Sequence, residues 1–337
     1  FLGGAALTPD YVANTCAPAL NAPVVYCPDA FAGLKAMNEL KEGSLESTKA
    51  APRRAPLQSP ALPAEEVVID HSVPVPTAPF FGSKLVEGID VEKLYPLLTE
   101  QVLFRGRWGY RRGKLSAEEY EELIENEVRP QFDELKRRGL EEGIFQPKVV
   151  YGYYPCYSEG DDVVLLDRPE GEERARFRFP RQQEAPGLCV ADYFRGKDAE
   201  ERDLIALQVV TIGEEAHKRA EELYAADAYK EYLLFHGLSV ELAEALAEYW
   251  HREVRIELGI TEEDGSGIDD FVVQGYRGSR YSFGYPACPD MAGNEVIFDF
   301  LEPERIGVRL SEEGQMVPEQ TTSAFIVHHP QAKYFKV

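Results

Sequence analysis

The chain has 337 residues, of which 44% are hydrophobic and 28% are charged, a composition typical of a globular protein with one large domain or two ordinary ones. Its formal net charge of −23 argues against nucleic acid as a partner, because phosphate binding needs a basic surface. No apolar run approaches the roughly 18 residues that a membrane-spanning helix needs, so we expect no contact with a membrane.

Residues 1–45 have the pattern that closes an α/β domain. Phe1 and Leu2 continue a buried strand, which the glycines that follow interrupt, and a second short strand is predicted at residues 23–27 between two helices. Because the chain opens inside a strand and not on Met, we expect it to be a piece of a longer protein. Residues 46–65 are rich in Ala, Pro, Ser and Arg without periodicity, which predicts a linker.

The pattern changes from residue 66 onward. Ser116 and Glu119 form a predicted capping box that opens an amphipathic helix, which we expect to kink at Pro130 and to end at Gly139. Five strand-like runs follow, separated by turn residues, at 148–154, 162–166, 175–179, 188–194 and 204–212.

Two helices are then predicted, at 214–235 and 240–258, with a break at residues 236–239. Further strands are expected near 295–300 and 323–329. Strands, helices and strands in succession predict an α+β fold, a mainly antiparallel sheet with flanking helices, over residues 66–337.

The most unusual stretch is a loop at residues 277–290, which combines two arginines, two tyrosines, two prolines and two glycines. A guanidinium can bind a carboxylate through two parallel hydrogen bonds, and tyrosine faces can hold a flat base or a sulfonium cation. A surface loop whose prolines merely define turns explains the same residues equally well.

Three carboxylates, Glu241, Glu244 and Glu248, share one face of the second predicted helix. A solvated charged face is the simpler interpretation. A carboxylate opposite Arg280 would, however, complete a pair suited to an amino acid zwitterion, and the residues alone do not say which glutamate faces a ligand. Similarly, the turn Gly3-Gly4-Ala5 after a strand either lets a ligand approach the backbone or is an ordinary strand-to-helix turn.

No pattern for self-contained catalysis is present. The six histidines lack metal-ligand spacing, and GxSxG, Walker A and complete GxGxxG motifs are absent. The five scattered cysteines, an odd number without CxxC spacing, predict reduced thiols in a cytoplasm rather than disulfides or a structural zinc site. Binding is therefore favoured over catalysis by a nucleophile or a general base.

The loop resembles a known motif. Residues 280–289, RYSFGYPACP, are similar to the RPAPGYPACP motif of the reactivation domain of cobalamin-dependent methionine synthases. Further matching blocks fall in order across nearly all of residues 80–337, at 151–162, 179–183, 188–194, 236–238, 243–251 and 329–335. Residues 1–45 resemble the end of the cobalamin-binding domain that precedes this module in the family.

The resemblance implies a methyltransferase whose present portion binds S-adenosylmethionine and supports reductive methylation of inactive cob(II)alamin to methylcobalamin. That step restores methyl transfer from methyltetrahydrofolate to homocysteine. The implied partners are the cobalamin-binding domain of the same polypeptide and flavodoxin or a similar reductase. Zinc is expected only in the N-terminal part of such enzymes, and the cobalt-ligating DxHxxG motif is absent here, so no metal is expected in this chain.

Carried over by motif, Arg280 would bind the methionine carboxylate and Glu244 the amino group. The backbone near Ser282, Gly284 and Tyr285 would line the adenosyl side of the ligand. The aromatic residues Tyr334 and Phe335 would complete the pocket. Tyr285 would also lie nearest the corrin.

The turn at Gly3, Gly4 and Ala5 would border the corrinoid's nucleotide tail. The chain departs from the motif at 281–283, where Tyr-Ser-Phe replaces Pro-Ala-Pro and makes the loop bulkier. It also departs at a family aspartate, for which Glu100 is the candidate substitute. A separately encoded activator that binds S-adenosylmethionine or a corrinoid protein is the alternative function, and residues 1–45 argue against it.

Overall fold

The computed structural model describes residues 1–2, 9, 12–20, 23–27, 30–45, 68–182, 186–262, 264–265, 274–312 and 314–335. The chain divides into two compact units, Phe1–Glu65 and Glu66–Val337. The predicted linker at 46–65 lies outside the described residues, as does the turn Gly3-Gly4-Ala5. Within the described ranges, no helix is both long enough and apolar enough to cross a membrane.

The first unit contains a parallel β-bridge between Leu2 and Tyr26. Around it lie a π-helical turn, η1 (Val12–Cys16), the short helix α2 (Ala17–Ala19) and the longer helix α3 (Ala30–Lys41). A parallel pairing joined through helical segments is the connection found in α/β domains.

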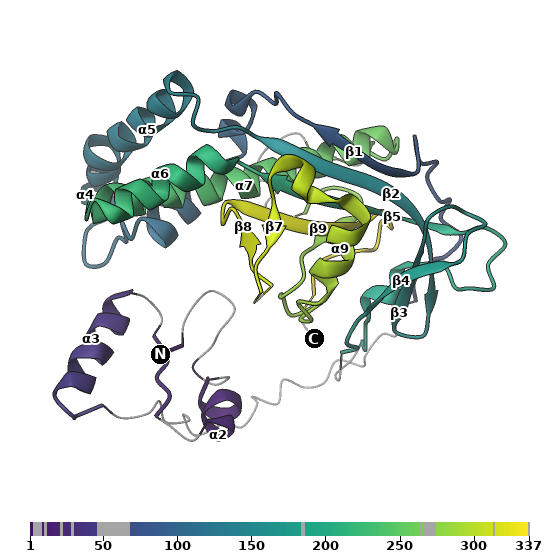
Figure 1. The fold of residues 1–337 in the computed structure, drawn as a ribbon, viewed down its shortest axis with the longest axis horizontal. Helices are drawn as coiled ribbons and strands as arrows, with labels where there is room; N and C mark the ends of the chain where they lie inside the picture. Colours follow the sequence, from purple (N-terminus) through teal and green to yellow (C-terminus); the bar gives the residue numbers. More distant parts are fainter. Residues whose placement is uncertain are drawn as a thin grey trace. The chain divides into compact units, whose positions relative to one another are not determined.

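The second unit is built on an antiparallel sheet (Figure 1). In the described part of the chain the order is β4-β3-β2-β5-β9-β6, and β1 pairs with the first half of the long strand β2. The strands are β1 (Gly82–Val86), β2 (Lys148–Glu159), β3 (Asp162–Leu166), β4 (Glu173–Arg178), β5 (Asp203–Thr211), β6 (Ser279–Tyr281) and β9 (Thr321–Val327). A separate two-stranded ribbon is formed by β7 (Arg309–Leu310) and β8 (Met316–Val317).

The helices of this unit are α4 (Ala117–Leu123), η5 (Ile124–Val128), α5 (Arg129–Glu141), α6 (Glu214–Ala225), α7 (Tyr229–Glu257) and α9 (Gly293–Leu301). Short turns of helix lie at η2 (Val91–Lys93), η3 (Tyr95–Leu97), η4 (Val102–Arg107), η6 (Val190–Tyr193) and η7 (Pro303–Ile306).

The sheet separates two hydrophobic cores, with α7 on one face and α9 on the other (Figure 1). Strand β2 contributes to both, because successive side chains of a strand point to opposite faces. Tyr151 and Tyr153 pack with α7, whereas Tyr154 and Cys156 pack with α9. The predicted α+β fold, an antiparallel sheet with flanking helices, is therefore confirmed.

The capping box that opens α4 is also as predicted, since Glu119 N–H donates to Ser116 Oγ and Ser116 N–H donates to the Glu119 carboxylate. The predicted end at Gly139 is wrong. Helix α5 continues to Glu141, and Gly139 lies in its interior, where a Cβ atom would come within 2.2 Å of the Phe145 ring. This glycine serves close packing. The turn is instead made at Gly143, which has a φ of +61°.

The predicted break at residues 236–239 is wrong for the same reason. Helix α7 runs without interruption through this segment, and the chain turns earlier, at residues 226–228. A Cβ atom on Gly237 would lie 2.9 Å from the Trp108 indole, so the missing side chain makes room for that ring. Trp108 Nε1 donates to the Leu234 carbonyl, which anchors the contact.

Two predicted strands are also wrong. Residues 188–194 contain the 3₁₀ turn η6, and residues 295–300 lie within helix α9. In α9 the buried apolar residues are spaced at i, i+1, i+3 and i+4, as in a helix that covers a sheet, and they are Ile297, Phe298, Phe300 and Leu301. A short apolar run does not distinguish this pattern from a buried strand.

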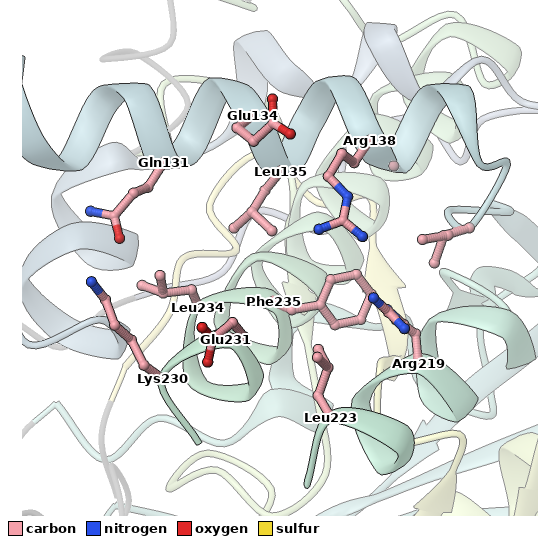
Figure 2. A pocket seen from close by; sticks show the side chains of 12 residues that line it. Gln131, Glu134, Leu135, Arg138, Arg219, Leu223, Lys230, Glu231, Leu234 and Phe235 are labelled. Atoms are coloured by element: carbon pink, nitrogen blue, oxygen red, sulfur yellow. The ribbon is translucent and has the colours of Figure 1, made fainter. Parts of the chain in front are cut away.

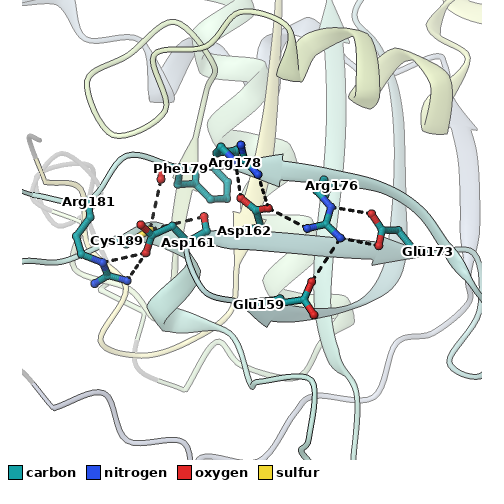
Figure 3. A network of polar contacts seen from close by, with 9 residues as sticks. All are labelled: Glu159, Asp161, Asp162, Glu173, Arg176, Arg178, Phe179, Arg181 and Cys189. Carbon is teal, nitrogen blue, oxygen red and sulfur yellow. Dashed lines mark hydrogen bonds and ion pairs between the residues drawn. The ribbon is translucent and has the colours of Figure 1, made fainter.

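Arginine–carboxylate pairs tie β3, β4 and the loop after them (Figure 3). Arg176 and Arg178 both donate to Asp162, and the hydrogen bond from Arg178 is the main reason that the pKa of Asp162 is lowered. Arg181 bridges Asp161 and Asp192 across the same corner. Three of the sequence blocks that carry the family resemblance contribute to these pairs, through Asp161 and Asp162, Arg181, and Asp192, and their contacts here are structural.

Candidate functional site

The loop after β6 is built from the sheet outward. Arg280 stands in β6 opposite Ile326 of β9, so its position is set by the sheet. The residue that enters the strand, Gly278, has a φ of +84°, and a Cβ atom there would lie 2.4 Å from the Val327 carbonyl oxygen. After β6 the loop folds back, with Gly284 N–H donating to the Cys288 carbonyl and Cys288 N–H donating to the Tyr285 carbonyl.

The departure from the family motif at 281–283 is accommodated inside the core. Tyr281 is buried, stacks on Phe325 at 5.4 Å between ring centroids and donates its hydroxyl to the Lys333 carbonyl. Phe283 is buried against Phe177. The bulkier residues therefore anchor the loop to the sheet.

Arg280 faces two carboxylates of α7. Its Nη2 atom lies 3.8 Å from Glu244 Oε2, and its Nη1 atom lies 3.4 Å from Glu248 Oε2. These distances make ion pairs without a hydrogen bond, and both Arg280 Nη1 and Glu248 Oε1 are buried without a hydrogen-bond partner. The pair therefore retains capacity to bind a further polar group.

A row of polar residues runs along this face of α7, spaced three and four residues apart: Glu241, Glu244, Glu248, His251 and Arg255. Such spacing brings side chains onto one face of a helix. At the start of the row Arg107, from the end of η4, donates to Glu241. Burial raises the pKa of Glu241, and Arg107 opposes that shift.

At the other end of the row the side chains are fully buried. Arg255 pairs with Asp264 at 3.0 Å, and its guanidinium lies 4.1 Å from the centre of the Tyr276 ring. His251 contacts the same ring edge-on at 5.2 Å. Burial holds the pKa of His251 well below its usual value, and the positive charges of Arg255 and Arg280 lower it further.

This buried histidine predicts a loss of stability in acid. Lowering the pH from 7 to 5 is expected to reduce the free energy of unfolding by about 2 kcal/mol through His251, because the unfolded chain takes up a proton below about pH 6.5 and the folded chain does not. Urea denaturation at both pH values measures the change. The His251→Gln variant should show a correspondingly weaker pH dependence, and an equal dependence in both proteins would contradict the assignment.

Most of the other predicted ligand residues lie around Arg280. Tyr285 is half exposed, and its pKa is raised by burial of the phenol and by the charge of Glu244, while Arg107 and Arg280 lower it. Tyr334 stacks beside Tyr281 at 6.3 Å, and Tyr285 is among the groups that raise its pKa, after burial and Cys288. The structure therefore brings Arg280, Glu244, Tyr285 and Tyr334 into one neighbourhood.

The remaining predicted residues have contacts of their own. Ser282 donates its hydroxyl to the Ser323 carbonyl, and its own carbonyl accepts a hydrogen bond from the Cys288 thiol. Phe335 is partly buried, with its ring 6.3 Å from that of Tyr193. Glu100 is held by two hydrogen bonds from Arg129, at 3.0 and 3.1 Å, and among the described residues no contact joins it to Arg280.

Residues that the sequence analysis did not assign complete the site. Arg107, His251 and Arg255 were not identified, and Glu248 was recognised only as part of a charged helix face. The three-and-four spacing of the glutamates was the available signal, since extending it by two steps reaches His251 and Arg255. Nothing in the local sequence of η4 indicated that Arg107 reaches α7.

A hollow of about 330 Å³ lies between α5, α6 and the start of α7 (Figure 2). Its floor is apolar, with Leu135, Leu223 and Phe235, and charged side chains stand at its rim. None of its lining residues comes from the loop at 277–290. In the described part of the chain, no group of three or more His, Cys, Asp or Glu side chains is arranged to hold a metal ion.

The chain is similar to known proteins. A family model described as "Vitamin B12 dependent methionine synthase, activation domain" matches residues 105–337. Methionine synthase of Mycobacterium tuberculosis (strain ATCC 25618 / H37Rv) is 42% identical over 377 aligned residues, which cover 100% of this chain and 32% of that protein. Methionine synthase of Mycobacterium leprae (strain TN) is 40% identical over 382 aligned residues, which cover 100% of this chain and 31% of that protein. The chain thus spans about a third of the length of these relatives.

A solved structure is also similar. It is described as "Crystal Structure of the MetH Reactivation Domain bound to AdoHcy", and it matches with a TM-score of 0.71 and 25% sequence identity. The match covers 79% of this chain and 84% of that one.

Proposed function

The chain belongs to the family of vitamin B12-dependent methionine synthase activation domains, and on that premise we propose that it binds S-adenosylmethionine and presents it as methyl donor in the reactivation of the synthase. One observation carries the proposal. Arg280 lies between Glu244 and Glu248 without hydrogen bonds to either, beside the tyrosine rings of the loop and the C-terminal segment. A similar structure is described as bound to AdoHcy, the product of such a transfer.

The proposed contacts follow from the chemistry of the ligand. The Arg280 guanidinium would bind the methionine carboxylate with two parallel hydrogen bonds, and Glu244, the more exposed carboxylate, would bind the ammonium group. The backbone of Ser282, Gly284 and Tyr285 would line the adenosyl side. Tyr334 and Phe335 would close the pocket, where aromatic faces suit a sulfonium cation. Glu100 would join the site only by breaking its pair with Arg129.

The proposed methyl transfer needs little acid–base catalysis from this chain. The thioether that leaves when the sulfonium loses its methyl group is neutral, so no proton has to be donated to it. The contribution of the protein is therefore to position the methyl group. The half-exposed Tyr285 would lie nearest the corrin.

We place the corrinoid on the cobalamin-binding domain of the same polypeptide. If it were reduced by one electron from flavodoxin or a similar reductase in the cytoplasm, the corrinoid would supply the nucleophile to which this chain presents the methyl group. The residues proposed to border its nucleotide tail, Gly3, Gly4 and Ala5, lie outside the described residues. Similarity to methionine synthases across the whole chain favours this role over that of a separate activator.

Calorimetric titration of the chain with S-adenosylmethionine and with S-adenosylhomocysteine tests the proposal. We expect one site for each, and weaker binding of 5′-methylthioadenosine, which lacks the carboxylate and the ammonium group. Thermal denaturation with excess ligand should show a rise in Tm, since a ligand that binds only the folded state stabilises it. Absence of heat and of a Tm shift with both sulfur ligands would contradict the proposed function.

A further inference from the structure

Buried polar atoms without partners are concentrated beneath Arg280. They are Glu248 Oε1, Arg280 Nη1, both ring nitrogens of His251 and Arg255 Nη1. Folded proteins leave few such atoms unpaired, and several together mark a place where water or a ligand completes the hydrogen bonding. This polar layer joins α7 to β6 directly below the guanidinium that we assign to the ligand.

The two carboxylates beside Arg280 are not equivalent. The Glu248 side chain is 19% exposed and the Glu244 side chain is 44% exposed. A charge that is withdrawn from water interacts more strongly with its neighbours. The electrostatic attraction between Glu248 and the guanidinium is therefore stronger than that between Glu244 and the guanidinium. The two carboxylates also face different nitrogen atoms of Arg280, with Glu248 on Nη1 and Glu244 on Nη2.

The deeper residues add to this arrangement. Arg255 is fully buried and bound to Asp264, so its positive charge is fixed in place. Between the carboxylates and Arg255 on the helix stands His251, which is fully buried and influenced by both guanidinium groups. The guanidinium of Arg280 therefore has like charge on its Arg255 side and the partly exposed carboxylate of Glu248 beside it.

We propose that Glu248 is a positioning residue, which holds the guanidinium of Arg280 away from Glu244 and so keeps both groups open to the zwitterionic end of the ligand. The inference rests on the proposed function of Arg280 and Glu244 as ligand residues. It assigns to Glu248 no contact with the reacting atoms.

Removing the charge of Glu248 would change this balance. In the Glu248→Gln variant, Arg280 would retain only Glu244 as a charged partner within reach and would move the short distance needed to hydrogen-bond to it. An incoming amino acid group would then have to break that pair. We therefore expect S-adenosylmethionine and S-adenosylhomocysteine to bind about tenfold more weakly.

The experiment compares ligands with and without the zwitterion. Calorimetry on the full chain should show the tenfold loss in Glu248→Gln for both amino acid-bearing ligands and unchanged affinity for 5′-methylthioadenosine. The Glu248→Asp variant, which retains the charge, should recover part of the affinity. Glu231→Gln is the matched control, because it is the same substitution at an exposed site on the same helix, and it should bind like the wild type.

Two outcomes would overturn the inference. Unchanged affinity of Glu248→Gln for S-adenosylmethionine would show that Glu248 does not position Arg280. An equal loss for 5′-methylthioadenosine would show a general structural role. If Glu248→Gln does not fold, Glu248→Asp takes its place and is expected to lose affinity only for the zwitterionic ligands. Failure of the wild-type chain to bind S-adenosylmethionine would instead contradict the proposed function itself.

Discussion

Replacing Arg280 by alanine is expected to lower the affinity for S-adenosylmethionine by about 100-fold or more. Truncating one partner of a largely desolvated charge pair costs roughly 2–5 kcal/mol, and the ligand carboxylate would lose both hydrogen bonds at once. Of the ligand contacts proposed for charged side chains, this one is the more buried, since Arg280 is 20% exposed and Glu244 is 44% exposed. Calorimetric titration of the folded variant measures the loss.

The control for this variant lies in the same loop. Arg277 donates to the His328 carbonyl, away from the two carboxylates, so Arg277→Ala should bind the ligand like the wild type. Arg280→Lys keeps the charge but not the two-pronged geometry and should show an intermediate affinity. Circular dichroism must show that Arg280→Ala is folded, because the substitution leaves Glu248 without a cation. Wild-type affinity in a folded Arg280→Ala protein would remove Arg280 from the site.

Replacing Asp203 by alanine is expected to cost about 3–5 kcal/mol of stability, because it removes a buried carboxylate on which several hydrogen bonds converge. Asp203 lies at the start of β5, 3% exposed, and its Oδ1 atom is 2.6 Å from Nε2 of His328. It also accepts hydrogen bonds from the backbone N–H groups of Arg195 and Leu204. Three donors would lose their acceptor at once. Urea denaturation measures the change in the free energy of unfolding.

The same carboxylate predicts a dependence on pH. Although burial acts to raise it, the pKa of Asp203 is held below its usual value, chiefly by the hydrogen bond and charge of His328. A carboxylate with a lowered pKa stabilises the fold above the unfolded-state pKa, near 4, and this contribution is lost as the pH falls through the folded-state pKa. The Asp203→Ala variant should not show this loss of stability as the pH falls. Asp198→Ala, an exposed aspartate nearby, is the control, and equal stability of the two variants would contradict the role of Asp203.

Asp203 also connects the fold to the candidate site. His328 directly follows β9 and precedes the segment that carries Tyr334 and Phe335. Weakening the contact between Asp203 and His328 is therefore expected to make the segment that carries Tyr334 and Phe335 more mobile before the sheet itself unfolds. This consequence was not evident from the sequence, where the two partners are 125 residues apart.

Much of the fold followed from local pattern. Alternating and continuous apolar runs located β2, β3, β4, β5 and β9. The helix predicted at 240–258 located the C-terminal part of α7. These features depend on the periodicity of strands and helices, which neighbouring residues determine. The errors were made at glycines and at short apolar runs. Gly139 and Gly237 were interpreted as helix breaks, but each is a contact point for an aromatic ring from a distant segment.

By itself, the sequence determined the fold class with its mainly antiparallel sheet, the loop at 277–290 and the resemblance of that loop to a family motif. Only the tertiary structure decided which charged groups meet. Glu248 was one of three equivalent glutamates until β6 placed Arg280 against it, and the local sequence did not indicate that Arg107 reaches α7. The physical reason is that burial and charge pairing depend on segments far apart in the chain, whereas periodicity depends on neighbours.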